Sequence, residues 1–80
     1  MPKFAPRSQQ AAFLKTLREA REDMGLTQVQ LARRLKHHQS FVSKAELGER
    51  RLDVIELRLV CKGIGISLAD FLERLEHNLK

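Results

Sequence analysis

The sequence predicts an all-α domain built from five helices. Apolar residues recur at intervals of three and four along most of the chain, and three segments share one helix-start pattern, a capping residue followed by an apolar one. Aromatic residues make up only 5% of the chain, with no Trp or Tyr, which suits a small core of Leu, Ile, Val and Ala. Eighty residues suffice for one modest hydrophobic core. We therefore expect residues 8–80 to form a single domain, preceded by a flexible basic arm over residues 1–7.

The first helix is expected from Ser8 to Met24. Ser8 can accept the first free amide hydrogens as N-cap, and Gly25 can adopt the left-handed conformation that ends a helix. The inward face of this helix carries residues at helical spacing, namely Phe13, Leu17, Ala20 and Met24. The preceding arm holds both prolines and two basic residues, a combination that resists regular structure.

Three later helices are expected to begin at a capping residue joined to a hydrophobic contact. In each, a small polar residue is followed three positions later by a side chain that can reach back to it: Thr27 with Gln30, Asp53 with Glu56, and Ser67 with Asp70. The last of these helices should run to about His77.

The helix that follows Asp53 should continue to Ile64. Gly65 closes it, and Gly63 weakens its last turn. Its inward residues are Leu57, Val60, Cys61 and Ile64, with the lone cysteine acting as a small buried filler.

Residues 26–47 read as two short helices joined by a tight turn. The first places Leu31, Ala32 and Leu35 on one face, and the second, from about Gln39 until Gly48 ends it, places Val42 and Ala45 on another. The second lacks capping chemistry, since His38 stands at its cap position. Its solvent side carries short polar side chains that can hydrogen-bond base edges in a major groove: Gln39, Ser40, Ser43 and Lys44. The segment is thus a helix-turn-helix suited to reading DNA.

Positive charge is concentrated on this same segment. The chain has a formal net charge of +5, and residues 28–51 hold six Lys and Arg side chains against two Glu, a net of +4. Such a patch attracts polyanions, with nucleic acid the best fit and an acidic protein an alternative. No apolar run approaches membrane-spanning length, and the first residues lack a secretory signal, so we expect a cytoplasmic protein without a membrane partner.

These residues resemble the phage-repressor and Cro-like helix-turn-helix proteins, also called the xenobiotic-response-element (XRE) family of bacterial regulators. The resemblance covers about Leu14 to Leu72, through LREAREDMGLTQ, SFVSKAELGERR and GISLADFL. It implies a lambda-repressor-like bundle of five helices, bacterial or phage-derived, that binds double-stranded operator DNA as a two-fold dimer. A sequence-specific transcriptional regulator, most simply a repressor, is the function this implies.

The resemblance also implies roles for individual residues. Base contacts fall to Gln39, Ser40, Ser43 and Lys44, and phosphate contacts to Gln28, Lys36, His38, Arg50 and Arg51. Arg21 and Glu46 match a pair that forms an internal salt bridge. Lys36 and His37 depart from the family pattern, which has Gly and then a small apolar residue in the turn. The turn must therefore accept a left-handed residue other than glycine or adjust slightly, and a left-handed lysine there costs on the order of 1 kcal/mol.

The last predicted helix carries an apolar stripe longer than one small core requires: Leu68, Phe71, Leu72, Leu75 and Leu79. We expect Leu68 and Leu72 in the core. Phe71, Leu75 and Leu79 are instead assigned to a contact with a second copy of the chain.

Other functions find less support in the sequence. His37, His38 and His77 lack the further ligands of a metal site, and no cofactor is expected. Ser43 and Lys44 lack a third orienting group for catalysis, so an enzyme is not expected. The rival interpretation is a protein-interaction module, an antitoxin or adaptor with the same fold whose partner is a toxin or another protein.

Overall fold

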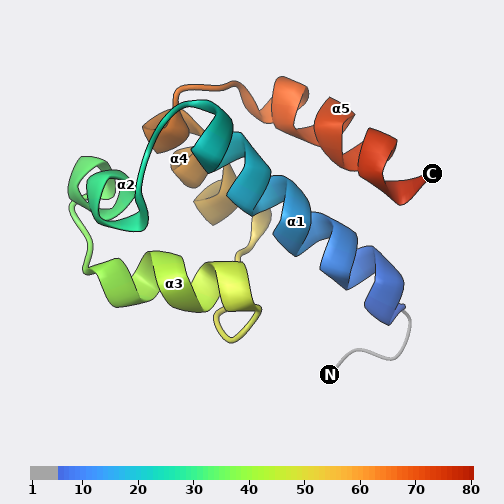
Figure 1. The fold of residues 1–80 in the computed structure, drawn as a ribbon, viewed down its shortest axis with the longest axis horizontal. Helices are drawn as coiled ribbons and strands as arrows, with labels where there is room; N and C mark the ends of the chain where they lie inside the picture. The colour runs from blue at the N-terminus through green and yellow to red at the C-terminus, as the bar shows by residue number, and fades with distance from the viewer. Residues whose placement is uncertain (1–5) are drawn as a thin grey trace.

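The computed structural model describes residues 6–80, which contain five helices and no strand (Figure 1). The helices are α1 (Arg7–Asp23), α2 (Gln28–Leu35), α3 (Gln39–Leu47), α4 (Val54–Ile64) and α5 (Leu68–Leu79). The all-α prediction is therefore confirmed. In Figure 1, α5 lies beside α1, while α2 and α3 lie on the other side of the molecule. Within residues 6–80, no helix has both the length and the apolar character needed to cross a membrane.

The three predicted helix starts depend on local hydrogen bonds that are present. The Thr27 hydroxyl accepts from the amide of Gln30 at 3.1 Å, and the Gln30 side chain accepts from the amide of Thr27 at 2.9 Å. Asp53 and Glu56 form the same reciprocal pair at 2.8 and 3.0 Å. At α5 the Ser67 hydroxyl accepts from the amide that follows it by three residues, at 3.0 Å. These bonds satisfy backbone donors that a helix start leaves without partners.

The start of α1 differs from the prediction that Ser8 caps it. The cap residue is Pro6, and its carbonyl accepts from the amides of Gln9 and Gln10 at 3.1 Å. Pro6 already has an extended backbone with φ of −60°, so the helix can begin at Arg7 without a side-chain cap. Arg7, the last residue of the expected arm, is thus helical. Residues 1–5 of that arm lie outside the described part of the chain.

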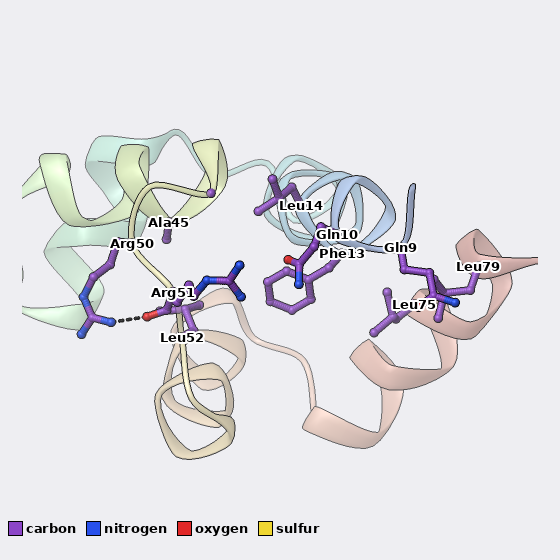
Figure 2. A pocket seen from close by; sticks show the side chains of 11 residues that line it. Gln9, Gln10, Phe13, Leu14, Ala45, Arg50, Arg51, Leu52, Leu75 and Leu79 are labelled. Carbon is purple, nitrogen blue, oxygen red and sulfur yellow. Dashed lines mark hydrogen bonds between the residues drawn. The ribbon is translucent and has the colours of Figure 1, made fainter. Parts of the chain in front are cut away.

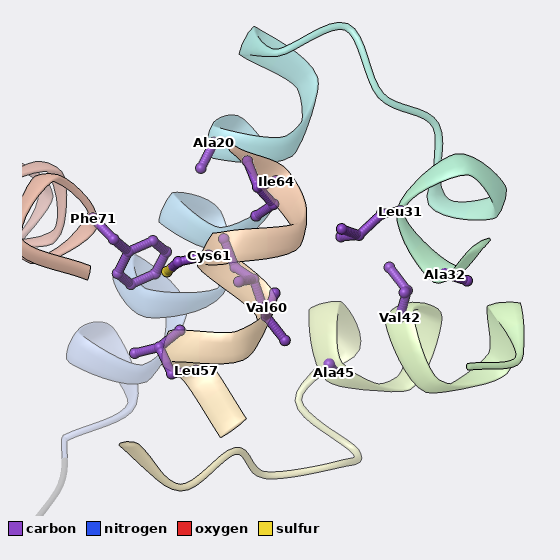
Figure 3. Packing of buried hydrophobic residues seen from close by; sticks show 11 residues of the cluster. Ala20, Leu31, Ala32, Val42, Ala45, Leu57, Val60, Cys61, Ile64 and Phe71 are labelled. Carbon is purple, nitrogen blue, oxygen red and sulfur yellow. The ribbon is translucent and has the colours of Figure 1, made fainter. Parts of the chain in front are cut away.

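The core is a single cluster to which all five helices contribute (Figure 3). Phe71, Leu31 and Ile64 are its largest fully buried apolar side chains. The four inward residues predicted for α4, including Cys61, are all buried. Burial raises the pKa of the Cys61 thiol to about 11, so it remains protonated at neutral pH.

Part of the prediction for α5 is wrong. Phe71 was assigned to a contact between copies, but it is 0% exposed and meets the Phe13 ring edge to face, with centroids 5.8 Å apart. Leu72, expected in the core, is instead 42% exposed. The reason is the position of α5 along α1, which turns the Phe71 side of the helix inward. Met24, expected on the inner face of α1, is likewise exposed because α1 ends just before it.

Polar contacts show that α5 runs antiparallel to α1. The Arg74 guanidinium pairs with Asp23 at 2.6 Å near the end of α1, and Asn78 donates to the Thr16 hydroxyl at 2.8 Å in its middle. Leu75 and Leu79 are half-buried farther along the same interface. Phe71 is thus used inside the domain, whereas the assignment of Leu75 and Leu79 to a contact with a second copy stays a prediction.

Gly63 has a packing role that the sequence did not suggest. A Cβ built at this position would lie 2.6 Å from Cδ2 of Leu35 and 3.2 Å from Cδ1 of Leu31. The missing side chain thus allows α4 to approach α2 closely. The close packing of α4 at Gly63 against Leu31 and Leu35 holds α2, the first helix of the helix-turn-helix, against the core.

Candidate nucleic-acid interface

The turn between α2 and α3 is built on Lys36, which adopts φ 60° and ψ 41°. It is the one residue other than glycine with a positive φ in the described part of the chain. The amide of His37 donates to the carbonyl of Ala32 at 2.9 Å and closes α2. The left-handed turn expected in the absence of glycine is therefore present, and α2 and α3 keep the spacing of a helix-turn-helix.

Side chains of α3 divide into a buried and an exposed face. Val42, Ala45 and Glu46 are buried against α1 and α2. Ala32 of α2 and Ala45 of α3 are small, so the two helices can pack closely. Three of the four residues expected to contact bases lie on the exposed face, namely Gln39, Ser40 and Lys44. Ser43 is half-buried beside them. The exposed face of α3 is thus polar at these positions, and the apolar Leu47 is exposed only at the last residue of the helix.

A buried ion pair fixes the orientation of α3. The Arg21 guanidinium of α1 donates to both carboxylate oxygens of Glu46, at 2.6 and 3.0 Å, and to the carbonyl of Leu26 at 2.7 Å. The hydrogen bond to Glu46 raises the pKa of Arg21 further above its usual value. A bidentate arginine–carboxylate pair restricts rotation as well as distance. The recognition helix is thus held at one angle to α1.

Gln28 joins this pair to the exposed face of α3. Its amide nitrogen donates to Oε1 of Glu46 at 3.0 Å, and its oxygen accepts from Nε2 of Gln39 at 3.5 Å. Gln28 is half-buried at the first residue of α2, where the positive end of the helix dipole favours an anion. Gln28 therefore contacts Gln39, one of the residues expected to contact bases.

Arg50, expected at a phosphate, is engaged within the protein. Its guanidinium forms an ion pair with Glu56 at the start of α4 and lies over the Phe41 ring, 5.6 Å from the centroid. The hydrogen bond between the two charged groups raises the pKa of Arg50 and lowers that of Glu56. The His37 ring stacks on Phe41 with centroids 4.6 Å apart. The sequence did not indicate these contacts, because Glu56 was already assigned to its helix cap.

The two neighbouring arginines of the α3–α4 loop point in different directions (Figure 2). Arg51 extends toward Gln10 and Phe13 of α1, and it lines a groove of about 340 Å³ between α1, the loop and the end of α5. Arg50 lies on the opposite side of the loop, where its guanidinium donates to the carbonyl of Arg51. The expected phosphate contacts are therefore not one cluster. Lys36 and His38 lie exposed at the turn, whereas the two arginines lie on the loop beyond α3.

Comparisons with known proteins agree with this geometry. A family model described as Helix-turn-helix (HTH_3) matches residues 17–71. No protein in the curated set matches the chain.

Solved structures give similar folds over most of the chain. An XRE-family like protein from Pseudomonas syringae pv. tomato is 51% identical, with a TM-score of 0.79 over 86% of this chain and 84% of that one. The clp gene regulator ClgR from C. glutamicum is 28% identical, with a TM-score of 0.78 over 95% and 96%. The restriction-modification controller protein C.Esp1396I is 24% identical and shares the fold, with a TM-score of 0.83 over 92% and 95%.

Proposed function

The chain belongs to the XRE/Cro-like helix-turn-helix family of DNA-binding transcription regulators, and we propose that it acts as a dimeric repressor on a pseudo-palindromic operator. The observation that carries this proposal is the division of α3. One face is buried and held by the Arg21–Glu46 pair, while the other presents Gln39, Ser40 and Lys44 to solvent. Repression follows most simply from a bound dimer that excludes polymerase from a promoter.

In the proposed complex, α3 lies in the major groove. Gln39 is suited to the paired acceptor and donor of adenine, and Lys44 to the acceptors of guanine. The hydroxyl groups of Ser40 and Ser43 can bond a donor or an acceptor on a base edge, but these side chains are shorter than those of Gln39 and Lys44. Each good base contact contributes about 1–3 kcal/mol of discrimination against the wrong base. Sequence preference should therefore depend mainly on Gln39 and Lys44.

Phosphate contacts are assigned to the elements around α3. Five residues precede or follow α3 along the chain: Gln28 at the start of α2, Lys36 and His38 at the turn, and Arg50 and Arg51 on the loop. Contacts of this kind fix register on the duplex and carry little sequence information. Arg50 contributes to DNA binding only if its guanidinium leaves Glu56 for a phosphate, or bonds the carboxylate and the phosphate at the same time.

A single α3 covers only half of such an operator. Helix-turn-helix dimers place their recognition helices in successive major grooves about 34 Å apart, so the operator mirrors the two-fold symmetry of the protein. We accordingly expect two similar half-sites separated by one helical turn. A second copy of the chain completes the site.

The test is selection from random duplexes at two salt concentrations, followed by titration of the selected site. Gln39→Ala and Lys44→Ala should each cost about 1–3 kcal/mol on the selected site and leave binding to random duplex much less affected. Lys36→Ala should instead weaken all sequences alike and reduce the salt slope by about one. Lys15→Ala, an exposed lysine on α1 outside the helix-turn-helix, is the charge-matched control.

Two results would contradict the proposal. Salt-sensitive binding without any selected motif would exclude sequence-specific reading by α3. Equal losses from Lys15→Ala and Lys44→Ala would show that only overall charge matters. In either case, a protein partner would become the better explanation for the exposed polar face of α3.

A further inference from the structure

The Arg50 guanidinium is held by several contacts within the domain. Its Nη2 atom pairs with Oε2 of Glu56, and its Nη1 atom lies 3.3 Å from Oε1 of the same carboxylate. Nη1 also donates to the carbonyl of Arg51. The group lies over the ring of Phe41, which belongs to the first turn of α3, 5.6 Å from the ring centroid. A residue of the loop that follows α3 is thus brought back to the beginning of that helix.

This position is close to the residues proposed to contact DNA. Gln39 and Ser40, two proposed base contacts, are exposed on the same first turn of α3. The His37 ring, in the turn before α3, stacks on Phe41. The N-terminal residues of a recognition helix are those that contact base edges, so the duplex approaches this end of the helix. Arg50 is therefore held beside the part of α3 that DNA reaches in the proposed complex.

Both members of the ion pair are accessible to solvent. The Arg50 side chain is 44% exposed and the Glu56 side chain is 32% exposed. Ion pairs with this exposure are weak, because water and salt screen them. The bond to Arg50 lowers the pKa of Glu56, so the carboxylate is charged at neutral pH. A phosphate offers arginine the same bidentate arrangement as a carboxylate, so the two anions can exchange without disturbing the core.

The charge of Glu56 is not needed for its other contact. Its Oε1 atom accepts from the amide of Asp53 at 3.0 Å and so helps to cap α4. At the start of α2, the neutral side chain of Gln30 accepts from the amide of Thr27 at 2.9 Å in the same way. An uncharged side chain can therefore supply this cap. What the negative charge of Glu56 adds is the ion pair with Arg50.

We infer that Glu56 limits the affinity of this domain for the DNA backbone, because its carboxylate competes with phosphate for the Arg50 guanidinium. This inference rests on the proposed function, in which Arg50 meets a duplex. The competition should weaken binding to all sequences alike, because phosphate contacts carry little sequence information. Glu56 is thus a positioning residue that acts through Arg50.

The first test compares the wild type with Glu56→Gln for binding to a random duplex, measured by fluorescence anisotropy over a range of salt concentrations. Glutamine keeps the cap acceptor, as Gln30 does, so circular dichroism should be unchanged. The variant should bind about two- to fivefold more tightly at low salt. Its affinity should also fall more steeply with salt, because Arg50 then adds a phosphate contact. A folded variant with wild-type affinity would overturn the inference.

Glu49→Gln is the matched control for charge. Glu49 is exposed on the same loop, one residue before Arg50, and forms no ion pair within residues 6–80. Both variants remove one negative charge, so a general effect of net charge should raise both affinities equally. In an Arg50→Gln background, the gain from Glu56→Gln should fall to the gain from Glu49→Gln. A larger gain that persists without Arg50 would refute competition for its guanidinium.

Glu56→Asp replaces the first variant if Glu56→Gln does not fold. Aspartate occupies the same third position of α5, as Asp70, so it is compatible with a helix start. It is one methylene group shorter than glutamate, which draws the carboxylate back from Arg50 while the net charge is unchanged. This variant should also bind random duplex more tightly, and only when Arg50 is present. Wild-type affinity in Glu56→Asp would then contradict the inference.

Selection from random duplexes separates failure of this inference from failure of the proposed function. If Glu56→Gln gains affinity through Arg50 but the wild type selects no motif, the regulator proposal fails and the inference stands. If the wild type selects a two-fold motif and Glu56→Gln binds no more tightly than Glu49→Gln, the inference fails and the regulator proposal stands. A wild type that binds no duplex would refute both.

Discussion

Replacing Glu46 with Gln removes the counter-charge from a buried guanidinium. Arg21 is 7% exposed and Glu46 is 9% exposed, so neither group can be solvated fully without displacing α3. Breaking a buried ion pair by removing one partner costs about 3–5 kcal/mol. Glutamine keeps an acceptor for Arg21 and Gln28, so we expect Glu46→Gln to cost about 3 kcal/mol, at the lower end of that range.

This loss is large for a domain of 80 residues. At roughly 0.05–0.15 kcal/mol per residue, its total free energy of unfolding is about 4–12 kcal/mol. Urea unfolding followed by circular dichroism measures the change. With an m-value of about 1 kcal/mol/M, the midpoint should fall by about 3 M. The control is Glu22→Gln, which removes the same charge from a 57% exposed carboxylate 4.0 Å from the same arginine and should cost below about 0.5 kcal/mol.

A second variant keeps the test decisive if Glu46→Gln does not fold. Replacing both partners with apolar residues, as in Arg21→Met combined with Glu46→Leu, leaves no buried charge and should recover most of the stability. The difference between the double variant and the sum of the single variants is the coupling energy of the pair. Equal losses from Glu46→Gln and Glu22→Gln would refute the conclusion that this ion pair holds α3.

Four further predictions concern local features. Lys36→Gly should raise stability by about 0.5–1 kcal/mol in urea, because it relieves a left-handed backbone, while weakening DNA binding in a filter assay. Gly63→Ala should lower stability by about 1 kcal/mol in the same urea assay, because overpacking against α2 outweighs the gain in helix propensity. Cys61 should react with a thiol reagent at about pH 8 only in denaturant, since its pKa is about 11 and it is buried. Arg50 holds the pKa of Glu56 below its unfolded value, so this carboxylate stabilises the fold above the unfolded pKa and loses that effect as the pH falls through the folded one. Between about pH 5 and pH 3, the wild type should therefore lose stability more steeply than Glu56→Gln in pH-dependent urea titrations.

Local capping chemistry was predictable from the sequence. The reciprocal bonds of Thr27 with Gln30 and of Asp53 with Glu56 join residues three positions apart, so no knowledge of the rest of the fold is needed. The left-handed turn at Lys36 was one of two alternatives implied by the resemblance, because the family has glycine at this position. Ser8 failed as a cap because the preceding proline could begin the helix without one.

Contacts between distant elements were harder to predict. Periodicity shows which residues of a helix share a face, but not which neighbour covers that face. Phe71 and Leu72 were therefore assigned to the wrong surroundings, although the stripe to which they belong was seen. Ile55 and Leu59 show the same limit, because they lie on the side of α4 opposite the residues assigned to the core. Only the fold shows that no other helix of the domain covers them.

The bonds around Glu46 differ in strength in the order that the proposed function requires. Arg21 and Glu46 are joined by two short charge-assisted bonds, so this pair is the rigid part of the network. Gln28 is joined to Glu46 by an ordinary bond of 3.0 Å, and Gln39 is joined to Gln28 at 3.5 Å, the upper limit for such a bond. In the proposed complex, the contact that would break as Gln39 turns to a base is thus the longest of the three, so its exchange should cost little. The stronger bonds remain and keep α3 at the angle from which Gln39 can reach the base.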